Sequence, residues 1–328
     1  MVDSLNILIL SCGTRNKIVQ YFKKELSGQG KVFATDCTPL APALYEADDF
    51  FIIPRVQEEG YLEKVLSICK NNSIKAVFSL IDPELNVLAE YKDLFLEMGV
   101  TPVVSEKEAI EMSLDKYAMF TFLKKNCFST VNSYVDKEEF YKDKKAGKIT
   151  YPVFIKPALG SASMNINKVE TDEEVDLLFK RYKYLMIQEF ITGKEYGVDA
   201  YIDLISGELN SIFIKEKIKM RSGETDKSVS VKDEKLSNLI VDFVKKTHFK
   251  GVIDIDVFKI EDEYYISEVN PRFGGGYPHA YEAGVNFPKM LINNLEGITN
   301  KRSFNSYEEG MYMMKYNEVI VKNCQFEQ

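Results

Sequence analysis

Histidine is scarce in this 328-residue sequence, which contains only His248 and His279. Two imidazoles exclude a histidine-rich zinc site and argue against a Ser-His-Asp triad, since both arrangements place histidine at the reacting centre. Whatever chemistry the chain performs must then be carried by Lys, Arg, Asp, Glu and Asn. That set of side chains points toward phosphoryl chemistry with a hard cation.

Paired cysteines are lacking as well. No CxxC spacing occurs among the five cysteines, which are Cys12, Cys37, Cys69, Cys127 and Cys324. An odd number at this spacing fits reduced thiols in a cytosolic protein better than a disulfide framework. Cys12 follows an apolar strand, where a nucleophile could stand, but a small buried side chain is the favoured interpretation.

Long apolar runs and an excess of positive charge are both missing. No stretch approaches the roughly 20 apolar residues of a membrane span, and no cationic leader precedes an apolar run, so a cytoplasmic protein without a membrane partner is expected. The net charge is −8. Nucleic acid is therefore not expected as a partner, because phosphate backbones are bound by Lys and Arg patches. A small anionic ligand needs only a local cluster of cations.

Familiar nucleotide-binding signatures are also missing. The segment 11–15 (Ser-Cys-Gly-Thr-Arg) has one of the three glycines of GxGxxG, so it predicts a strand–helix turn, and Asp36 is expected to cap or close a turn rather than bind a ribose. GxxxxGK[ST] occurs nowhere in the chain, which excludes a P-loop. No HRD or DFG follows Lys156, which excludes a protein kinase.

The first third of the chain alternates short apolar runs with amphipathic stretches. Strands are expected at 5–10, 31–34, 51–53, 76–80 and 101–104, with helices at 17–26, 61–71 and 85–98. This order predicts βαβ units and a Rossmann-like parallel sheet covered on both faces. Ligands of such sheets lie at the carboxyl ends of the strands, which here carry 11–15, Asp36 and the Asp-Pro-Glu of 82–84.

The pattern changes after residue 105, and an α+β region follows. A helix is expected to begin near Ser113 with Lys116 in its first turn, followed by strands at 131–135, 153–157, 166–169 and 185–190 and a helix at 172–182. Further strands are expected at 196–204, 209–217, 253–259 and 264–269, with a mobile loop at 220–235 and a helix at 236–247. The predicted domains are 1–112, 113–191 and 192–328.

The strongest local signal is the strand 264–272, Tyr-Tyr-Ile-Ser-Glu-Val-Asn-Pro-Arg. Alternation puts Glu268 and Asn270 on one face, and Asp256 on the preceding strand of an apparent hairpin can converge with them. Three oxygen side chains without histidine or thiolate suit Mg²⁺, which substrate phosphates usually complete. Taken alone, Asp256 and Glu268 fit equally well as solvent-facing strand residues.

Two further segments carry weaker signals. Lys156 stands in the apolar strand Val-Phe-Ile-Lys-Pro and needs an anionic partner if it is buried, while the small-residue turn at 160–163 can direct backbone N–H groups at phosphate. The strand 186–191 with Glu195 has the form of a hinge whose backbone could pair with adenine while Glu195 binds the ribose. Each segment alone also fits an ordinary strand and turn.

The order of these segments resembles the ATP-grasp superfamily over about residues 105–295. Within it the chain is most similar to one synthetase unit of the carbamoyl-phosphate synthetase large subunit and to free-standing carboxylate–amine ligases. The upstream region, with Asp-Pro-Glu-Leu at 82–85, resembles the pre-ATP-grasp domain. Only one unit and no glutaminase segment are apparent, so carbamoyl phosphate is not expected as the product of this chain alone.

The resemblance implies a two-lobed ATP-grasp fold that binds ATP with two Mg²⁺ ions, Mn²⁺ being an alternative. Residues implied at the phosphates are Lys116, Lys156, Gly160, Ser161 and Ser163. Residues implied at the adenine and ribose are Gln188, Glu189, Phe190, Ile191 and Glu195. The metal ligands would be Asp256, Glu268 and Asn270.

The implied reaction joins a carboxylate to an amine, or to a thiol, through an acyl phosphate and releases ADP and phosphate. Arg272 would hold the γ-phosphate and the acyl phosphate, with Lys156 beside it. Arg221, in the expected loop, is a candidate for gripping the acyl phosphate or a substrate carboxylate, unless it is simply solvated. The glycines at 274–276 would let backbone approach a ligand, and Tyr277 and His279 would line the acceptor pocket.

Three other functions compete with this interpretation. An ATP-grasp small-molecule kinase and an ATP-dependent carboxylase would share the fold. A non-catalytic nucleotide-binding regulatory protein is disfavoured by the complete set of Asp256, Glu268 and Asn270, because binding alone has little need for two-metal geometry. The sequence leaves open the carboxylate and amine substrates, and also whether the chain forms homo-oligomers.

Overall fold

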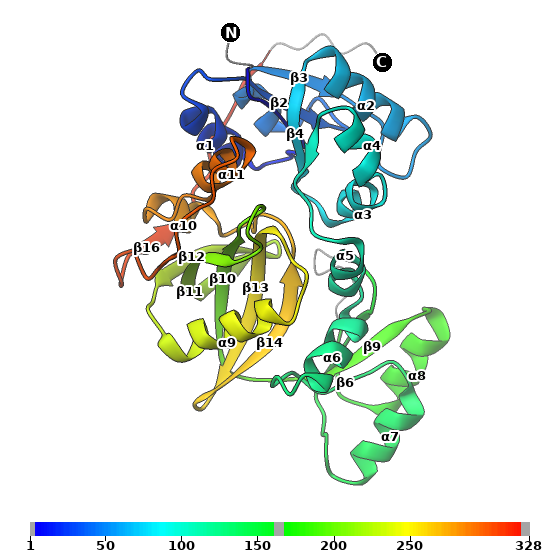
Figure 1. Ribbon diagram of the computed structural model, residues 1–328. Coiled ribbons are helices and arrows are strands. Elements are labelled where there is room, and N and C mark those ends of the chain that lie inside the picture. The colour runs from blue at the N-terminus through cyan, green and yellow to red at the C-terminus, as the bar shows by residue number, and fades with distance from the viewer. Residues whose placement is uncertain (1–3, 161–166, 323–328) are drawn as a thin grey trace.

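Three regions follow one another in the computed structural model, which describes residues 4–160 and 167–322. Figure 1 shows the N-terminal region at the top, a large lobe below it, and a small lobe at the lower right that α5 joins to the N-terminal region. The predicted fold class, an α/β region followed by two α+β lobes, is confirmed.

The N-terminal region is built on a parallel sheet in the order β3-β2-β1-β4-β5. Its strands are β1 (Asn6–Leu10), β2 (Val32–Asp36), β3 (Asp49–Ile52), β4 (Ile74–Ser79) and β5 (Thr101–Pro102). The connecting helices are α1 (Asn16–Leu26), the 3-10 helix η1 (Pro42–Glu46), α2 (Tyr61–Asn71), α3 (Asp82–Glu90) and α4 (Lys92–Glu97). Every residue of β1 and β2 is buried, as expected for a parallel sheet covered on both faces.

Two details of this region bear on the sequence predictions. The helix expected at 85–98 is wrong as a single element, because α3 begins earlier, at Asp82 with Pro83 in its first turn, and Tyr91 leaves helical geometry between α3 and α4. Asp36 has the turn role predicted for it, since its carboxylate accepts hydrogen bonds from the N–H groups of Gly13 (2.9 Å) and Thr38 (3.2 Å).

The described cysteines are unpaired thiols, as their spacing predicted. Cys12, Cys37, Cys69 and Cys127 are free. Cys12 is fully buried, and this burial raises the pKa of its thiol, so it behaves as a small apolar side chain. Cys324 lies outside the described residues.

The small lobe contains a four-stranded antiparallel sheet in the order β6-β9-β7-β8. Its elements are α6 (Lys116–Lys125), β6 (Ser133–Tyr134), α7 (Lys137–Lys145), β7 (Val153–Pro157), β8 (Asn167–Val169), α8 (Asp172–Arg181) and β9 (Leu185–Glu189), with α5 (Lys107–Leu114) leading into it. Lys116 is the first residue of α6, as predicted, because Asp115 caps the helix by accepting from two backbone N–H groups.

The large lobe has a seven-stranded sheet in the order β14-β13-β10-β11-β12-β16, with β15 beside β11. Its elements are β10 (Lys194–Ile202), β11 (Leu209–Arg221), β12 (Glu224–Ser230), α9 (Glu234–Lys245), β13 (Gly251–Ile260), β14 (Glu263–Asn270), α10 (Pro278–Glu282), α11 (Phe287–Leu295), β15 (Ser303–Phe304) and β16 (Tyr312–Met314). The mobile loop expected at 220–235 is wrong: β11 and β12 form a hairpin there, and α9 begins at Glu234.

The two faces of this sheet differ because side chains alternate along each strand. One face is apolar and packs on α9, with Val198, Ile214 and Ile255 among its fully buried members. On the other face, Tyr201 and Phe213 pack against the N-terminal region at one end of the strands. Toward the other end that face is charged.

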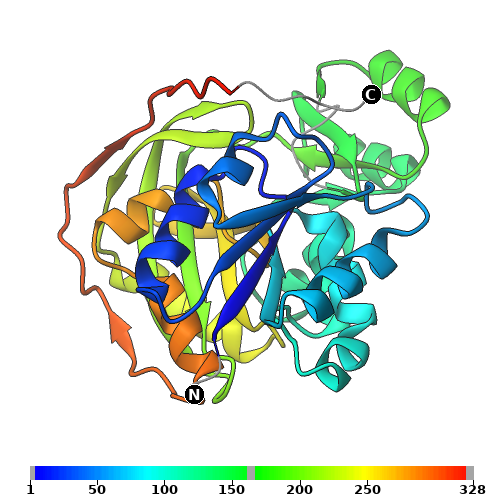
Figure 2. The ribbon, with the colours of Figure 1, turned by 90° about the horizontal axis from the view of Figure 1, so that it is seen from above.

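The C-terminal segment runs along the outside of the large lobe, as the orange-to-red ribbon in Figure 2 shows. It is fastened to the sheet edge where β16 pairs with β12, and Ser230 Oγ donates to the carbonyl of Glu308 (2.7 Å). This pairing covers the edge of β12 and carries Lys315 toward the charged face.

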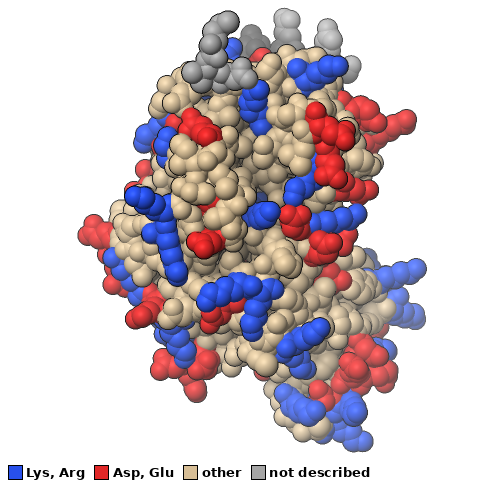
Figure 3. Space-filling model, viewed as in Figure 1, with Lys and Arg blue, Asp and Glu red and all other residues tan. Residues whose placement is uncertain are grey.

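No helix among the described residues is long and apolar enough to cross a membrane. On the face drawn in Figure 3, acidic and basic side chains are intermixed, without one large patch of either sign.

Candidate active site

The β13–β14 hairpin brings together the three predicted metal ligands. In its antiparallel register Asp256 lies opposite Glu268, and Asp254 lies opposite Asn270. Residues 254, 256, 268 and 270 therefore share one face of the sheet. This convergence is what the alternation in the sequence predicted for Asp256, Glu268 and Asn270.

These side chains line a cavity of about 210 Å³ between the N-terminal region and the large lobe. Arg272, another predicted residue, lines the same cavity. Its further lining comes from the β1–α1 turn and the β4–α3 connection of the N-terminal region, from the β11–β12 hairpin and from the glycine loop after β14, and includes Arg15, Asp82, Lys217, Glu224, Asp254 and Gly276.

Lys217 is a member of this site that the sequence did not reveal. Its ammonium lies 2.6 Å from Asp256 Oδ1 and 2.7 Å from Glu195 Oε1, and its side chain is only 4% exposed. Burial alone would lower the pKa of Lys217, but the carboxylates of Asp256 and Glu195 outweigh it and raise that pKa. A fixed cation thus stands between two carboxylates, one of which was predicted to bind metal and the other the ribose.

The two predicted lysines of the small lobe, Lys116 and Lys156, act on Glu268 of the large lobe. Lys156 donates to Gln188 Oε1 at 2.8 Å, and Lys116 donates to the carbonyl of Gly160. Burial lowers the pKa of Lys156, with Glu268 acting in the opposite direction. Burial likewise raises the pKa of Glu268, while Lys116 and Lys156 oppose that rise. Lys156 of the small lobe and Glu268 of the large lobe therefore each favour the charged form of the other.

The predicted adenine side of the site lies on and after β9. Gln188, which accepts from Lys156, also donates to Ser133 Oγ (3.1 Å), and Glu189 accepts from Asn132 Nδ2 (2.8 Å). The Phe190 ring packs on Phe154 at 5.1 Å between centroids. Ile191 is half-buried. Gly160 has a positive φ of 98°, whereas Ser161 and Ser163 lie outside the described residues.

Arg272 links the large lobe to the N-terminal region. Its Nη2 lies 2.9 Å from Asp82 Oδ2, at the start of α3, and 3.4 Å from Asn270 Oδ1. Burial alone would lower the pKa of Arg272, but Asp82 outweighs this and raises it. Arg272 Nε is buried without a partner among the described residues. A buried donor of this kind is available to an anion in the cavity.

Glu224, which also lines the cavity, joins three parts of the chain. Its Oε1 lies 2.8 Å from Nη2 of Arg15, which follows β1, and its Oε2 lies 2.8 Å from Nζ of Lys315, in the C-terminal segment. Glu224 itself directly follows the two-residue turn between β11 and β12. Sequence spacing gave no signal for this triad because its members are far apart along the chain.

The three glycines after Arg272 lie directly on charged side chains. A Cβ at Gly274 would collide with the carboxylate of Asp254, one at Gly275 would lie 2.6 Å from Cδ of Glu224, and one at Gly276 would lie 2.6 Å from Cε of Lys215. Lys215 in turn forms a fully buried ion pair with Asp199. These glycines are therefore needed for close packing on the protein's own charges, and not only for approach to a ligand as the sequence suggested.

Three residues predicted near the substrate are not among the described residues that line the charged cavity. Arg221 forms an ion pair with Asp226 (3.1 Å), is half exposed, and is not among the residues lining the cavity. The expectation that Tyr277 and His279 line an acceptor pocket is wrong: both are buried. The Tyr277 hydroxyl donates to Val285 O, and His279 lies between Ser228 Oγ (2.8 Å) and Met311 O (3.0 Å).

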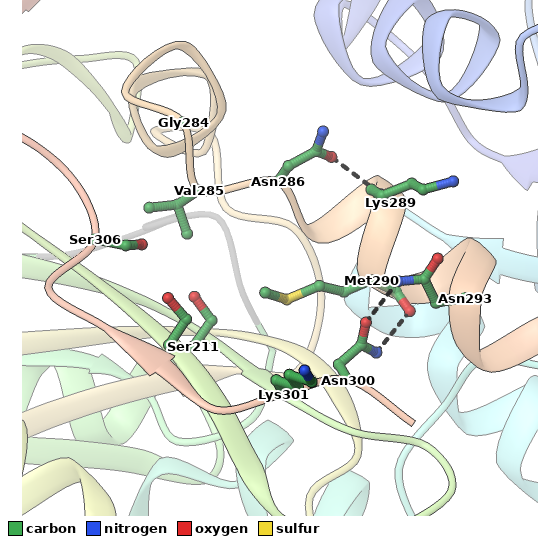
Figure 4. A pocket seen from close by; sticks show the side chains of 11 residues that line it. Ser211, Gly284, Val285, Asn286, Lys289, Met290, Asn293, Asn300, Lys301 and Ser306 are labelled. Carbon is green, nitrogen blue, oxygen red and sulfur yellow. Dashed lines mark hydrogen bonds between the residues drawn. The ribbon is translucent and has the colours of Figure 1, made fainter. Parts of the chain in front are cut away.

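A second cavity, of about 300 Å³, lies beside α11 and the start of β15. Figure 4 shows its side chains, which include the Ser211 and Ser306 hydroxyls, Met290 and Val285. Among the described residues that line it there is no carboxylate or imidazole, and its ionisable groups are Lys289 and Lys301, so it lacks the carboxylate ligands of a magnesium site. The chemistry is therefore assigned to the charged cavity.

Metal-ligating side chains are few in the charged cavity. Among the described residues, no group of three or more His, Cys, Asp or Glu is arranged as a metal site. The predicted oxygen ligands are the carboxylates of Asp256 and Glu268 and the amide of Asn270. Asp254 lines the cavity beside them, whereas Asp82 and Glu224 are ion-paired with Arg272 and Arg15. Such a set leaves several coordination positions to phosphate oxygens or water, as Mg²⁺ usually requires.

Comparison with known proteins gives two family matches. Residues 113–276, half of the chain, match the ATP-grasp domain, and residues 7–103 match the PylC-like N-terminal domain. The D-alanine–D-alanine ligase of Natranaerobius thermophilus is 27% identical over 236 residues, which cover 61% of this chain and 63% of the ligase. The carbamoyl phosphate synthase large chain of Lachnoclostridium phytofermentans is 27% identical over 241 residues, which cover 67% of this chain and 22% of the synthase.

These matches span less than two thirds of either relative's length. Among solved structures, N5-carboxyaminoimidazole synthetase from Staphylococcus aureus complexed with ADP superimposes with a TM-score of 0.72 at 17% identity, over 91% of this chain and 79% of that protein. At this identity the superposition concerns the fold alone.

Proposed function

The chain belongs to the ATP-grasp family, and from this premise we propose that it is a ligase that joins a carboxylate to an amine through an acyl phosphate, forming ADP and phosphate from ATP. One observation supports the proposal above the others. The cavity brings the carboxylates of Asp256 and Glu268 together with the guanidinium of Arg272, and Lys116 and Lys156 of the small lobe favour the charged form of Glu268.

The nucleotide would lie between the two lobes. Lys116 and Lys156 would bind its phosphates, and the turn that begins at Gly160 and continues through Ser161 and Ser163 would cover them. The Gln188–Ile191 segment would hold the adenine, with Glu195 on the ribose. Support for this placement comes from the contact between Lys156 and Gln188, which puts the phosphate lysine beside the adenine segment.

Asp256, Glu268 and Asn270 fit a divalent metal. They supply hard oxygens only, and the Lys217 ammonium already occupies a cation position between Asp256 and Glu195. These ligands would hold one or two Mg²⁺ ions, or Mn²⁺. Bound there, the metal would neutralise charge on the phosphates as they approach the substrate carboxylate.

The protein's own side chains would then provide the remaining catalysis. Arg272, with a free buried Nε, would bind the transferred phosphoryl group, since a carboxylate and ATP repel each other until their charge is neutralised. Lys217 and Lys156 would add positive charge from two sides. The β11–β12 hairpin lies over the cavity and would limit access of water to the acyl phosphate until the amine attacks its acyl carbon and phosphate leaves.

A product assay tests this proposal. Purified protein with ATP and Mg²⁺ is screened against panels of carboxylates and amines, including amino acids, while ADP and phosphate are measured. We expect ADP and phosphate in equal amounts only when both a carboxylate and an amine are present. ADP formed with a stable phosphorylated product would indicate a kinase, and a requirement for bicarbonate would indicate a carboxylase. Nucleotide binding without turnover across the panels would contradict the proposal.

A further inference from the structure

Arg15 reaches the charged cavity from the N-terminal region. It ends the strand–helix turn after β1 and stands at the N-cap of α1, but its side chain makes no capping hydrogen bond. The guanidinium instead lines the cavity, with 21% of the side chain exposed. The turn thus directs a cation to the carboxyl end of a parallel strand, where ligands of such sheets bind.

The partner of Arg15 is a carboxylate of the protein itself. Glu224 contacts one terminal nitrogen of a guanidinium that has five N–H donors in a planar fork. The site is therefore already complementary to a carboxylate. Glu224 at the hairpin tip occupies the position that an acidic ligand would take.

Exchange of Glu224 for a ligand carboxylate would leave no charge unpaired. Lys315 already contacts the other oxygen of Glu224 at 2.8 Å. If a ligand replaced Glu224 on Arg15, Glu224 would keep Lys315, and the ligand would take Arg15. Breaking a buried ion pair is costly mainly because one charge is left alone, and this second cation removes that cost.

The size and lining of the cavity restrict the ligand further. A volume of about 210 Å³ is below the range of about 300–1,000 Å³ typical for drug-sized ligands. Leu80, Ile81 and Met220 form the apolar part of the lining, which has no aromatic ring among the described residues. The other charged groups at this end are the Arg272–Asp82 pair and Asp254, so Arg272 and Arg15 offer two separate guanidiniums.

We propose that Arg15 determines the specificity of this site: it binds a second anionic group on the carboxylate substrate, which is a short aliphatic acid with two carboxylates. Arg272 faces the carboxyl that is activated, and Arg15 holds the one that is not. The inference rests on the proposed ligase function and names its substrate class. Arg15 thus takes the substrate-gripping role that the sequence suggested for Arg221.

The test compares acids that differ only in the second carboxylate. Succinate, glutarate, aspartate and glutamate are each paired with the half-amide that lacks one charge: succinamate, glutaramate, asparagine and glutamine. Hydroxylamine serves as the amine, so its identity need not be known. The γ-phosphoryl group of ATP passes to a carboxylate oxygen and ADP leaves; the hydroxylamine nitrogen then attacks the acyl carbon, phosphate departs, and a hydroxamate forms.

In the wild-type protein, we expect at least one diacid to be used with a kcat/KM more than tenfold above that of its half-amide. Arg15→Ala should raise KM for that diacid about 10- to 100-fold, while kcat and the KM for ATP change less than threefold. Arg15→Lys should retain part of the preference. Glu224→Gln, which removes the competing carboxylate, should lower KM for the diacid. Arg55→Ala, an exposed arginine of the same region, is the matched control.

Binding is measured in parallel by calorimetry with β,γ-imido-ATP and Mg²⁺, so that the two proposals can fail separately. The role of Arg15 would be overturned if the protein formed hydroxamates without preferring a diacid to its half-amide, or if Arg15→Ala left KM unchanged. In either case the ligase function would still stand. If the wild-type protein binds a diacid, Arg15→Ala abolishes that binding, and no acid gives a hydroxamate, the binding role of Arg15 is supported and the ligase function is contradicted. If no diacid binds and none gives a hydroxamate, the inference is overturned.

Discussion

The two faces of the large-lobe sheet are made by the same three strands, β10, β11 and β13, yet they have opposite chemistry. On one face Val198, Ile214 and Ile255 are fully buried against α9 and its neighbours. On the other, one residue further along each strand, stand Asp199, Lys215 and Asp256. Neighbouring residues of one strand therefore have different roles: one packs in the apolar core, and the next carries a charge on the opposite face.

This difference teaches how the lobe can carry so many charges in one place. The apolar face contributes burial energy that does not depend on what the other face contains. The charged face can then concentrate like charges, such as Asp254 and Asp256, whose repulsion would be too costly in a sheet without that support. Substitutions on the two faces should accordingly affect different measurements.

The largest expected effect is on the charged face. Glu268→Gln keeps the shape of the side chain and removes its charge. The rate of ADP formation that requires the carboxylate substrate should therefore fall about a thousandfold, which corresponds to an activation free energy higher by about 4 kcal/mol. Because burial already raises the pKa of Glu268, its neutral substitute should not lower the melting temperature. Turnover near the wild-type rate in a folded variant would show that Glu268 is not a metal ligand.

The next effect concerns the one place where the charged face is fully covered. Lys215→Met leaves Asp199 buried without its partner, and we expect it to lower the free energy of unfolding by about 3 kcal/mol, measured by urea titration. The double variant Lys215→Met with Asp199→Asn should recover most of that loss. If the single variant is as stable as the wild type, this pair is not needed to keep the charged face folded.

A pH effect is expected at the same covered end. His279 Nε2 must donate to the carbonyl of Met311, and in the neutral ring Nδ1 then accepts from Ser228 Oγ. Burial and Lys215 lower the pKa of His279 from 6.5 to about 4. The unfolded chain therefore takes up a proton first, and stability present above pH 6.5 is lost as the pH falls toward 4, by about 3 kcal/mol.

The control for this pH effect is His279→Gln, which can keep both hydrogen bonds without titrating. Its unfolding free energy, followed by urea titration between pH 4 and 8, should lack the part of the slope that His279 contributes. Equal slopes in the two proteins would mean that the imidazole titrates alike when folded and unfolded.

The smallest effect is expected on the apolar face. Ile255→Val removes one buried methylene beside Asp256 in the sequence but on the opposite face, and should lower the free energy of unfolding by about 1 kcal/mol. Turnover per folded molecule should not change. A loss of turnover larger than the loss of folded protein would show that the two faces are coupled, contrary to the comparison above.

The sequence predicted those parts of the molecule that follow from local periodicity. The parallel sheet follows from the interleaving of strands with helices, the two lobes from the resemblance to the ATP-grasp superfamily, and the convergence of Asp256 with Glu268 and Asn270 from alternation along a strand. Lys217, Glu224 and Arg15 were missed because their importance depends on register between strands and on contacts between distant regions. No pattern within one segment contains that information.

The error at 220–235 has a different physical cause. The sequence of β12 predicted a loop because the residues that the strand buries are polar. Thr225, Asp226, Ser228 and Ser230 are at most 4% exposed. Buried polar groups are tolerated when they are hydrogen-bonded, and Ser230 is satisfied from the C-terminal segment. A strand stabilised by partners about 80 residues away looks unstructured when only its own residues are considered.

The attachment of the C-terminal segment also has a consequence for biosynthesis. During translation, the residues proposed to bind nucleotide and metal, up to Asn270, are made before Lys315, so the large-lobe sheet can form while its outer edge is still uncovered. β12 acquires its β16 partner, and Glu224 its second cation, only near the end of the chain. A nascent or truncated protein ending before Lys315 would hold Glu224 on Arg15 alone, with the acid site closed by its own hairpin.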